Sequence, residues 1–167
     1  MGQYALMSAA PAVLRLIPAF RPGRVLAGGG QKTQRHFLDF QVDGVVLGQV
    51  VRGRADVVSV LVTDWPAGFP AQQVGQLLGE VPSSLPGGRV ALYVCPECGD
   101  LGCGGVTALV ERAHDEVVWR DLGWQTSNDP ELDLEPFGEL GPFRFGAALY
   151  EAVLGPLLDD PPAPPAR

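Results

Sequence analysis

The chain has 167 residues, of which 46% are hydrophobic and 19% are charged. This length and composition exclude a disordered chain and predict a globular domain with its own core. The net charge of −7 argues against nucleic acid as a partner, because phosphate binding needs a basic surface, and it is compatible with a basic protein partner.

Residues 1–31 are predicted to form a flexible extension. Three prolines interrupt this stretch before Arg24, and it ends in the triplet Gly28-Gly29-Gly30. Its apolar run at 5–20 has no positive residue before it and is too short to cross a bilayer, so neither a secretion signal nor a membrane anchor is expected. We therefore expect a cytoplasmic protein, in which cysteines are more often reduced or metal-bound than joined in structural disulfides.

The first element expected after this extension is a β-hairpin. Apolar and polar residues alternate at 38–42, the turn Asp43-Gly44 favours a positive φ, and residues 45–51 return as the second strand. The register of this hairpin places Phe40 opposite Leu47, which gives one apolar face.

Further strands and two helices complete an α+β pattern. In chain order we expect a strand at 57–62, a helix starting at Pro70, strands at 89–94, 106–111 and 117–122, an irregular acidic stretch at 125–140 and a helix starting at Gly141-Pro142 that includes Phe145. Because tight turns join most of the strands, the sheet is predicted to be mainly antiparallel and built from hairpins, with the two helices packed on one face. This single domain is assigned to residues 32–158, and the proline-rich segment 159–167 is expected to be a disordered tail.

All three cysteines lie in the stretch Cys95-Pro96-Glu97-Cys98-Gly99-Asp100-Leu101-Gly102-Cys103-Gly104. Its first half resembles the knuckle of zinc ribbons and rubredoxins, in which two thiolates face one ion and a glycine lets backbone amides point at the sulfurs. The third cysteine adds a third thiolate. We predict a metal site, with zinc as the metal, at Cys95, Cys98 and Cys103; the alternative is a reduced, glycine-rich turn whose thiols pack against the core.

A structural zinc site has four protein ligands, and the sequence contains no fourth cysteine. His114 is expected at the far end of the strand that follows the loop, roughly 30 Å away at ~3.3 Å per residue. His36 would be a ligand only if its strand end met the loop, whereas Glu97 and Asp100 lie within the loop itself.

A family resemblance rests on this loop and on three flanking motifs. The loop with its lead-in Tyr93-Val94, the pair Val106-Thr107, the run 117–121 (Val-Val-Trp-Arg-Asp) and the run 141–145 (Gly-Pro-Phe-Arg-Phe) are similar to a family of uncharacterised small bacterial proteins. The resemblance covers residues 33–155. It implies one compact domain and no particular activity.

The sequence contains neither a phosphate-binding glycine loop nor a serine nucleophile elbow. We therefore interpret the protein as a non-catalytic binding or regulatory module rather than an enzyme. One version is an inhibitor or immunity-like protein that presents a row of acids to a basic partner, namely Asp129, Glu131, Asp133 and Glu135.

The alternative is a thiol- or metal-dependent redox protein that uses Cys95, Cys98 and Cys103. Against it, no helix begins at the loop to lower a thiol pKa, and the anions Glu97 and Asp100 are expected to raise it.

Overall fold

The computed structural model describes residues 10–66, 68–126 and 129–159, apart from the side chains of 129–131. The strands are β1 (Leu14–Arg21), β2 (Arg24–Val25), β3 (Gln31–Lys32), β4 (Arg35–Val42), β5 (Val45–Val46), β6 (Val58–Ser59), β7 (Val90–Val94), β8 (Gly105–Ala113), β9 (Glu116–Thr126), β10 (Asp129–Asp133) and β11 (Phe143–Gly146). The helices are α2 (Leu47–Arg52), α3 (Gly68–Leu77), α4 (Ala147–Leu154) and α5 (Pro156–Asp159), with 3₁₀ turns η1 (Pro86–Gly88) and η2 (Leu101–Cys103). Each pairing between these strands is antiparallel, which confirms the predicted α+β class.

The largest sheet has the strand order β10-β9-β8-β7-β6, and β11 also pairs with β9. The predicted hairpin of β8 and β9 is confirmed, with Ala113 opposite Glu116 beside the turn. β7 pairs with β8, and Tyr93 lies opposite Val106. The cysteine loop therefore connects two neighbouring strands of the central sheet, whose backbones fix both of its ends.

An aromatic cluster forms the centre of the core. Trp119 of β9 is fully buried, and its ring makes edge contacts with Phe40, Phe145 and Tyr150. Its indole N–H donates to the Tyr150 hydroxyl at 3.0 Å, and that hydroxyl donates to the Leu77 carbonyl at 2.8 Å. The cluster thus joins the sheet to α3 and α4 with the polar ends of Trp and Tyr satisfied.

A second sheet has the order β1-β4-β5, and β1 pairs with β4 along its whole length. The prediction of an extension over residues 1–31 is therefore wrong for 14–21, while residues 1–9 lie outside the described part. Pro18 predicted a break in any regular element, because proline lacks a backbone N–H. In an edge strand the missing N–H of proline is tolerated, and β1 is the edge strand of this sheet.

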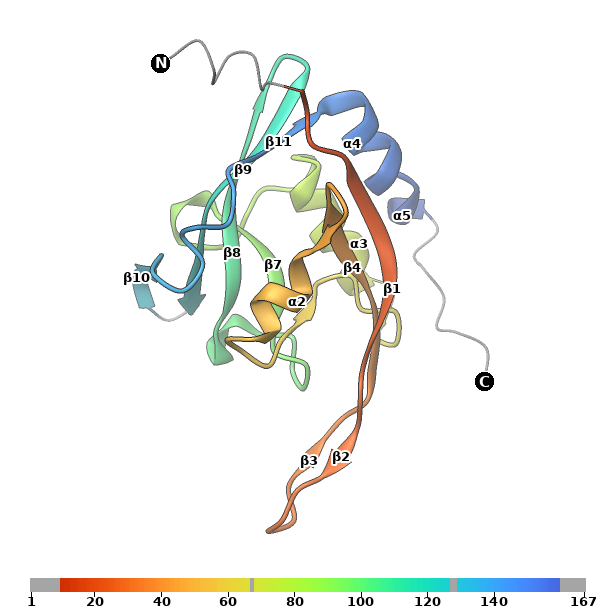
Figure 1. Ribbon diagram of the computed structural model, residues 1–167, viewed down its shortest axis with the longest axis vertical. Helices are drawn as coiled ribbons and strands as arrows, with labels where there is room; N and C mark the ends of the chain where they lie inside the picture. Colours follow the sequence, from red (N-terminus) through yellow and green to blue (C-terminus); the bar gives the residue numbers. More distant parts are fainter. Residues whose placement is uncertain (1–9, 67, 127–128, 160–167) are drawn as a thin grey trace.

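The hairpin of β2 and β3 continues β1 and β4 and projects away from the rest of the chain (Figure 1). Gly28 and Gly29 form its tip with φ values of 101° and 96°, which only glycine adopts without strain. The triplet therefore closes a hairpin and is not a linker between two structural units.

The predicted second strand at 45–51 is shorter than expected. Val45 pairs with Val42, but Leu47 begins α2, so the expected pairing of Phe40 with Leu47 is wrong. Leu47 and Val51 are buried at the i, i+4 spacing of a helix face, and this burial outweighs the strand propensity of the valines. Gly48 lets α2 approach β4, because a Cβ there would overlap the Asp39 carboxylate.

Two further expectations about the C-terminal third need correction. The stretch 125–140 is not irregular throughout, since β9 extends to Thr126 and β10 pairs with it. Phe145 belongs to β11, and α4 begins only after it.

The two expected helices correspond to α3 and α4, but α2 and α5 are additional, so the packing of two helices on one face is not confirmed. α4 lies beside β1 and leads into α5 (Figure 1). Over the described ranges, every helix is too short or too polar to cross a membrane.

Candidate metal centre

The first half of the cysteine loop forms a tight knuckle at the end of β7. The Gly99 N–H donates to the Cys95 carbonyl at 2.9 Å, and Gly99 has a φ of 68°. The Asp100 N–H donates to the Cys98 sulfur at 3.4 Å. Backbone amides that point at cysteine sulfurs stabilise the thiolate form that a metal ion requires.

The second half of the loop returns the third cysteine to the first two. η2 begins after Asp100, whose carboxylate accepts from the Gly102 N–H at 2.9 Å as an N-cap. Cys103 is the last residue of η2, and its N–H donates to the Asp100 carbonyl at 3.3 Å. The turn therefore places the Cys103 side chain over the knuckle.

The sulfur atoms of Cys95, Cys98 and Cys103 all lie within 4.8 Å of one another. The Cys98 and Cys103 sulfurs are 3.4 Å apart, whereas a disulfide bond measures about 2.05 Å. A tetrahedral zinc ion with Zn–S bonds of about 2.3 Å holds its sulfurs about 3.8 Å apart. The three thiols are thus free and spaced as ligands of one ion.

Aromatic rings pack against the loop at both of its outer glycines. A Cβ on Gly99 would lie 3.0 Å from the Trp65 ring, whose edge also contacts Phe69. Gly104 is buried against Trp124, at a distance that leaves no room for any side chain. The rings hold the loop in shape, so the thiol cluster is preformed.

Replacing Gly104 by alanine is expected to destabilise the protein by about 2–4 kcal/mol. Its φ of 86° and ψ of 153° lie in a region that is nearly restricted to glycine, and the new methyl group would also overlap Trp124. Urea denaturation measures the change. Gly102→Ala is the matched control, because its Cβ would meet Asp100 at an ordinary 3.6 Å; equal effects of the two substitutions would contradict the tight packing at Gly104.

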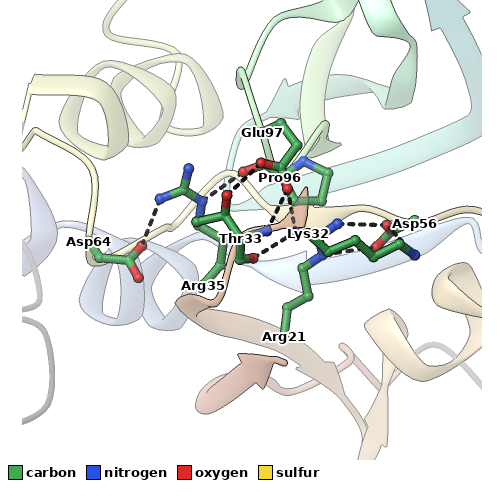
Figure 2. A network of polar contacts seen from close by, with 8 residues as sticks. All are labelled: Arg21, Lys32, Thr33, Arg35, Asp56, Asp64, Pro96 and Glu97. Carbon is green, nitrogen blue, oxygen red and sulfur yellow. Dashed lines mark hydrogen bonds and ion pairs between the residues drawn. The ribbon is translucent and has the colours of Figure 1, made fainter. Parts of the chain in front are cut away.

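A polar network ties the knuckle to the N-terminal strands (Figure 2). The Glu97 carboxylate accepts from Arg21 Nη1 at 2.7 Å, from the Thr33 N–H at 2.8 Å and from the Thr33 hydroxyl at 2.7 Å. Arg35 Nε donates to the Pro96 carbonyl at 2.7 Å. The two residues between the first two cysteines are therefore fixed by side chains of β1 and β4 and by the backbone and side chain of Thr33, which lies between β3 and β4.

Arg21 is the central cation of this network. Only 7% of its side chain is exposed, and it binds the Asp56 carboxylate through Nε at 3.1 Å and Nη2 at 2.7 Å in addition to Glu97. Lys32 also approaches Asp56, at 3.1 Å. The hydrogen bonds from Thr33 and then Arg21 lower the pKa of Glu97 from 4.5 to about 2, and the hydrogen bond from Arg21 lowers the pKa of Asp56.

Acid is expected to weaken the native protein through Glu97. A carboxyl group whose pKa is lower when folded stabilises the native state above its ordinary pKa, here 4.5, and that contribution is lost as the pH falls towards about 2. Glu97→Gln should therefore destabilise the protein at neutral pH and show a smaller further loss on acidification than the wild type, as measured by urea midpoints across pH. Because the side chain is 42% exposed, the effect is reduced by solvent screening. Glu111→Gln, which removes an exposed ion pair with Arg120, is the control; parallel pH profiles of Glu97→Gln and the wild type would contradict the role of Glu97.

The cysteines differ in acidity. Burial raises the pKa of Cys95, but hydrogen bonds from the backbone of Cys98 and Glu97 and from the other two thiols outweigh it, so the pKa is lowered overall. The hydrogen bonds with Cys98 and then Cys95 raise the pKa of Cys103 to about 11. The anions Glu97 and Asp100 are expected from the sequence to raise the pKa of a nucleophilic thiol, but the pKa of Cys95 is lowered overall.

The other residues considered as ligands have different roles. Glu97 is bound by Arg21 and Thr33, Asp100 caps η2, and His36 Nε2 lies 3.0 Å from the Gln34 amide nitrogen. His114 sits in the turn between β8 and β9 with a φ of 58°. In the part of the chain that the structure describes, no histidine, aspartate, glutamate or further cysteine joins the three sulfurs as a fourth ligand.

Sequence reasoning identified the cysteines but missed the residues that support them. Trp65, Trp124 and Arg21 lie far from the cysteines in the sequence, and none of them belongs to a motif that predicts a role at the loop. The signal that the sequence does contain is the glycine at positions 99 and 104, since glycine permits the close approach of a ring.

Comparisons of the chain with models of protein families, with curated proteins and with solved structures found no match. The candidate function therefore rests on the geometry of the loop.

Proposed function

We propose that the protein is a non-catalytic binding module whose cysteine loop holds a zinc ion through Cys95, Cys98 and Cys103. The observation that carries the proposal is the convergence of three free thiols within 4.8 Å of one another on a loop with fixed ends. Thiolate ligands select soft metals, and zinc is the one that proteins commonly hold with cysteine for structural purposes.

The chain supplies more than the ligands. The Asp100 N–H at the Cys98 sulfur and the backbone amides at the Cys95 sulfur offset the negative charge that three thiolates bring to one ion. The lowered pKa of Cys95 also favours the deprotonated form that binds metal. Bound zinc would join the end of β7 to the start of β8 and stiffen the loop.

A binding role is favoured over catalysis because no histidine joins the thiols in the described ranges, so no general base stands beside a nucleophile there. For the partner, we propose a basic protein that contacts the acids near β10. Asp133 and Glu135 are exposed, and β10 is the last strand in the order of its sheet. The side chains of Asp129 and Glu131 lie outside the described residues.

Zinc titration with thiol alkylation tests the metal site. Reduced, chelator-treated protein should bind one zinc ion per chain, and the ion should slow iodoacetamide modification of all three cysteines. Addition of chelator should restore the modification rate. Zinc binding without protection of the cysteines, or no binding at all, would contradict the proposal.

A second candidate is a peroxide-sensitive thiol pair, and the 3.4 Å between the Cys98 and Cys103 sulfurs favours it. Oxidation of two thiols by hydrogen peroxide gives one disulfide and two waters. This candidate would replace the first if the protein binds no zinc and peroxide links Cys98 to Cys103 in peptide maps.

A further inference from the structure

A cleft of about 360 Å³ opens beside the metal loop. Its walls come from α3, the segment before β7, β7 and the loop: Phe69, Gln73, Gln76, Ser84, Leu85, Ala91, Val94, Cys98, Gly99, Asp100 and Leu101. Cys98 therefore belongs both to the thiol cluster and to the lining of the cleft. Any ion at the cluster would lie beside this space.

The cleft contains the amide of a largely buried glutamine. Gln76 of α3 is only 7% exposed and lines the cleft, and its side chain makes no hydrogen bond to the described part of the chain. Among the described residues, every fully buried side-chain nitrogen or oxygen has a partner, so the amide of Gln76 is accessible from the open space of the cleft. Water satisfies such a group in the free protein, and a molecule in the cleft can take over its hydrogen bonds.

The thiol cluster leaves one coordination position for a molecule from outside. It supplies three protein ligands, and both Cys98 and Cys103 are exposed to solvent. Zinc sites with three protein ligands keep the fourth position for water or a substrate, whereas purely structural sites are closed by four.

We propose that the cleft binds a small thiol, uncharged or cationic, whose sulfur takes the fourth position on the zinc and whose polar head bonds to Gln76. This inference rests on the proposed zinc site. Three sulfur ligands make the ion soft, which favours sulfur as the fourth donor. On binding, the thiol loses its proton to solvent, a zinc–sulfur bond forms, and coordinated water leaves; no carbon bond changes and nothing is oxidised.

The charge of the ligand follows from the surroundings. A zinc ion with three thiolates carries a net charge of −1, and the charged side chain in the lining of the cleft is the anion Asp100. Among the described residues, no lysine or arginine lines it. A negatively charged thiol would therefore be repelled by the ion and by Asp100, which both lie at the loop.

Cobalt-loaded protein tests the proposal with three small probes of similar length and different charge: cysteamine, 2-mercaptoethanol and 3-mercaptopropionate. The visible absorption of cobalt reports on its ligands. We expect cysteamine and 2-mercaptoethanol to change the spectrum in a saturable way, and 3-mercaptopropionate to bind about tenfold or more weakly than cysteamine.

Two variants on α3 locate the head group. Gln76→Met keeps the size of the side chain and should weaken cysteamine binding about tenfold, the loss expected when one hydrogen bond of about 1.4 kcal/mol is removed. Gln72→Met, at an exposed position of the same helix, is the control and should have no effect. An unchanged cobalt spectrum before thiol is added shows that each variant folds and holds metal.

The outcomes separate the two proposals. If cobalt does not bind, the metal site itself is wrong. If cobalt binds through three thiolates and no thiol changes its spectrum, or if Gln76→Met and Gln72→Met behave alike, the metal site stands and the thiol site is overturned. Tighter binding of 3-mercaptopropionate than of cysteamine would also overturn it.

Discussion

Changing Cys98 to serine is expected to lower the zinc affinity by more than about 100-fold. Loss of a residue that only hydrogen-bonds a metal ligand already lowers the metal affinity 10- to about 100-fold. Cys98 is itself one of the three ligands, so its loss should lower the affinity further. Its sulfur lies 3.4 Å from Cys103 and accepts from the Asp100 N–H, so a hydroxyl in its place removes both a soft donor and a stabilised thiolate. Competition with a coloured zinc chelator measures the affinity.

The matched control for this substitution is Asp100→Asn. The amide oxygen of asparagine can still accept from the Gly102 N–H, so η2 should keep its cap while a nearby charge is removed. This variant should bind zinc within about tenfold of the wild type, because it loses no ligand. Equal affinities of Cys98→Ser and the wild type would show that zinc binds elsewhere.

Replacing Asp39 by alanine is expected to destabilise the protein by about 3–5 kcal/mol. Asp39 is fully buried and accepts from Tyr93 Oη at 2.7 Å, from Arg52 Nη1 at 2.9 Å and from the Phe40 N–H at 2.9 Å. Its removal leaves a buried hydroxyl and a half-buried guanidinium without their partner. Burial raises the pKa of Tyr93, and Asp39 raises it further, so the hydroxyl stays protonated and continues to need an acceptor.

Urea denaturation of Asp39→Ala and Asp115→Ala gives the comparison. Asp115 lies in the exposed turn between β8 and β9, and its loss should change stability by no more than about 0.5 kcal/mol. A decrease of less than about 1 kcal/mol in the free energy of unfolding of Asp39→Ala would contradict the role given to Asp39. Tyr93→Phe should cost less than Asp39→Ala, because it removes one hydrogen bond and leaves the ion pair with Arg52 in place.

The elements that the sequence predicted well are those set by local signals. Apolar residues flank a polar turn at His114-Asp115, and the structure forms β8 and β9 there. Val74 and Leu77 follow helical spacing, and both are buried in α3. In both elements, the spacing of apolar residues along the sequence matches the strand or helix that buries them on one face.

The elements that it missed depend on distant parts of the chain. The sequence of β1 contains Pro18, which usually interrupts a regular element. The strand forms because it pairs with β4 at the edge of a sheet, where the missing N–H of proline is tolerated. Val50 and Val51 have strand propensity, yet the burial of Leu47 and Val51 on one face of α2 decides the conformation of this segment. Propensity within a short window cannot represent either effect.

The same distinction applies to the candidate site. The three cysteines could be assigned together because they are close in sequence and follow a knuckle spacing. The bond from Arg21 to Glu97 spans 76 residues, and the ring of Trp124 reaches Gly104 only because β9 pairs beside β8. No spacing rule links such residues, so the support of the loop became visible only in three dimensions.

The most direct test of the account is the metal content of protein purified without chelator and without nickel affinity, together with a count of alkylated thiols in the native state. The account predicts one zinc ion per chain and three cysteines that react slowly until a chelator is added. Protein that contains no metal and has three freely reactive cysteines would contradict it.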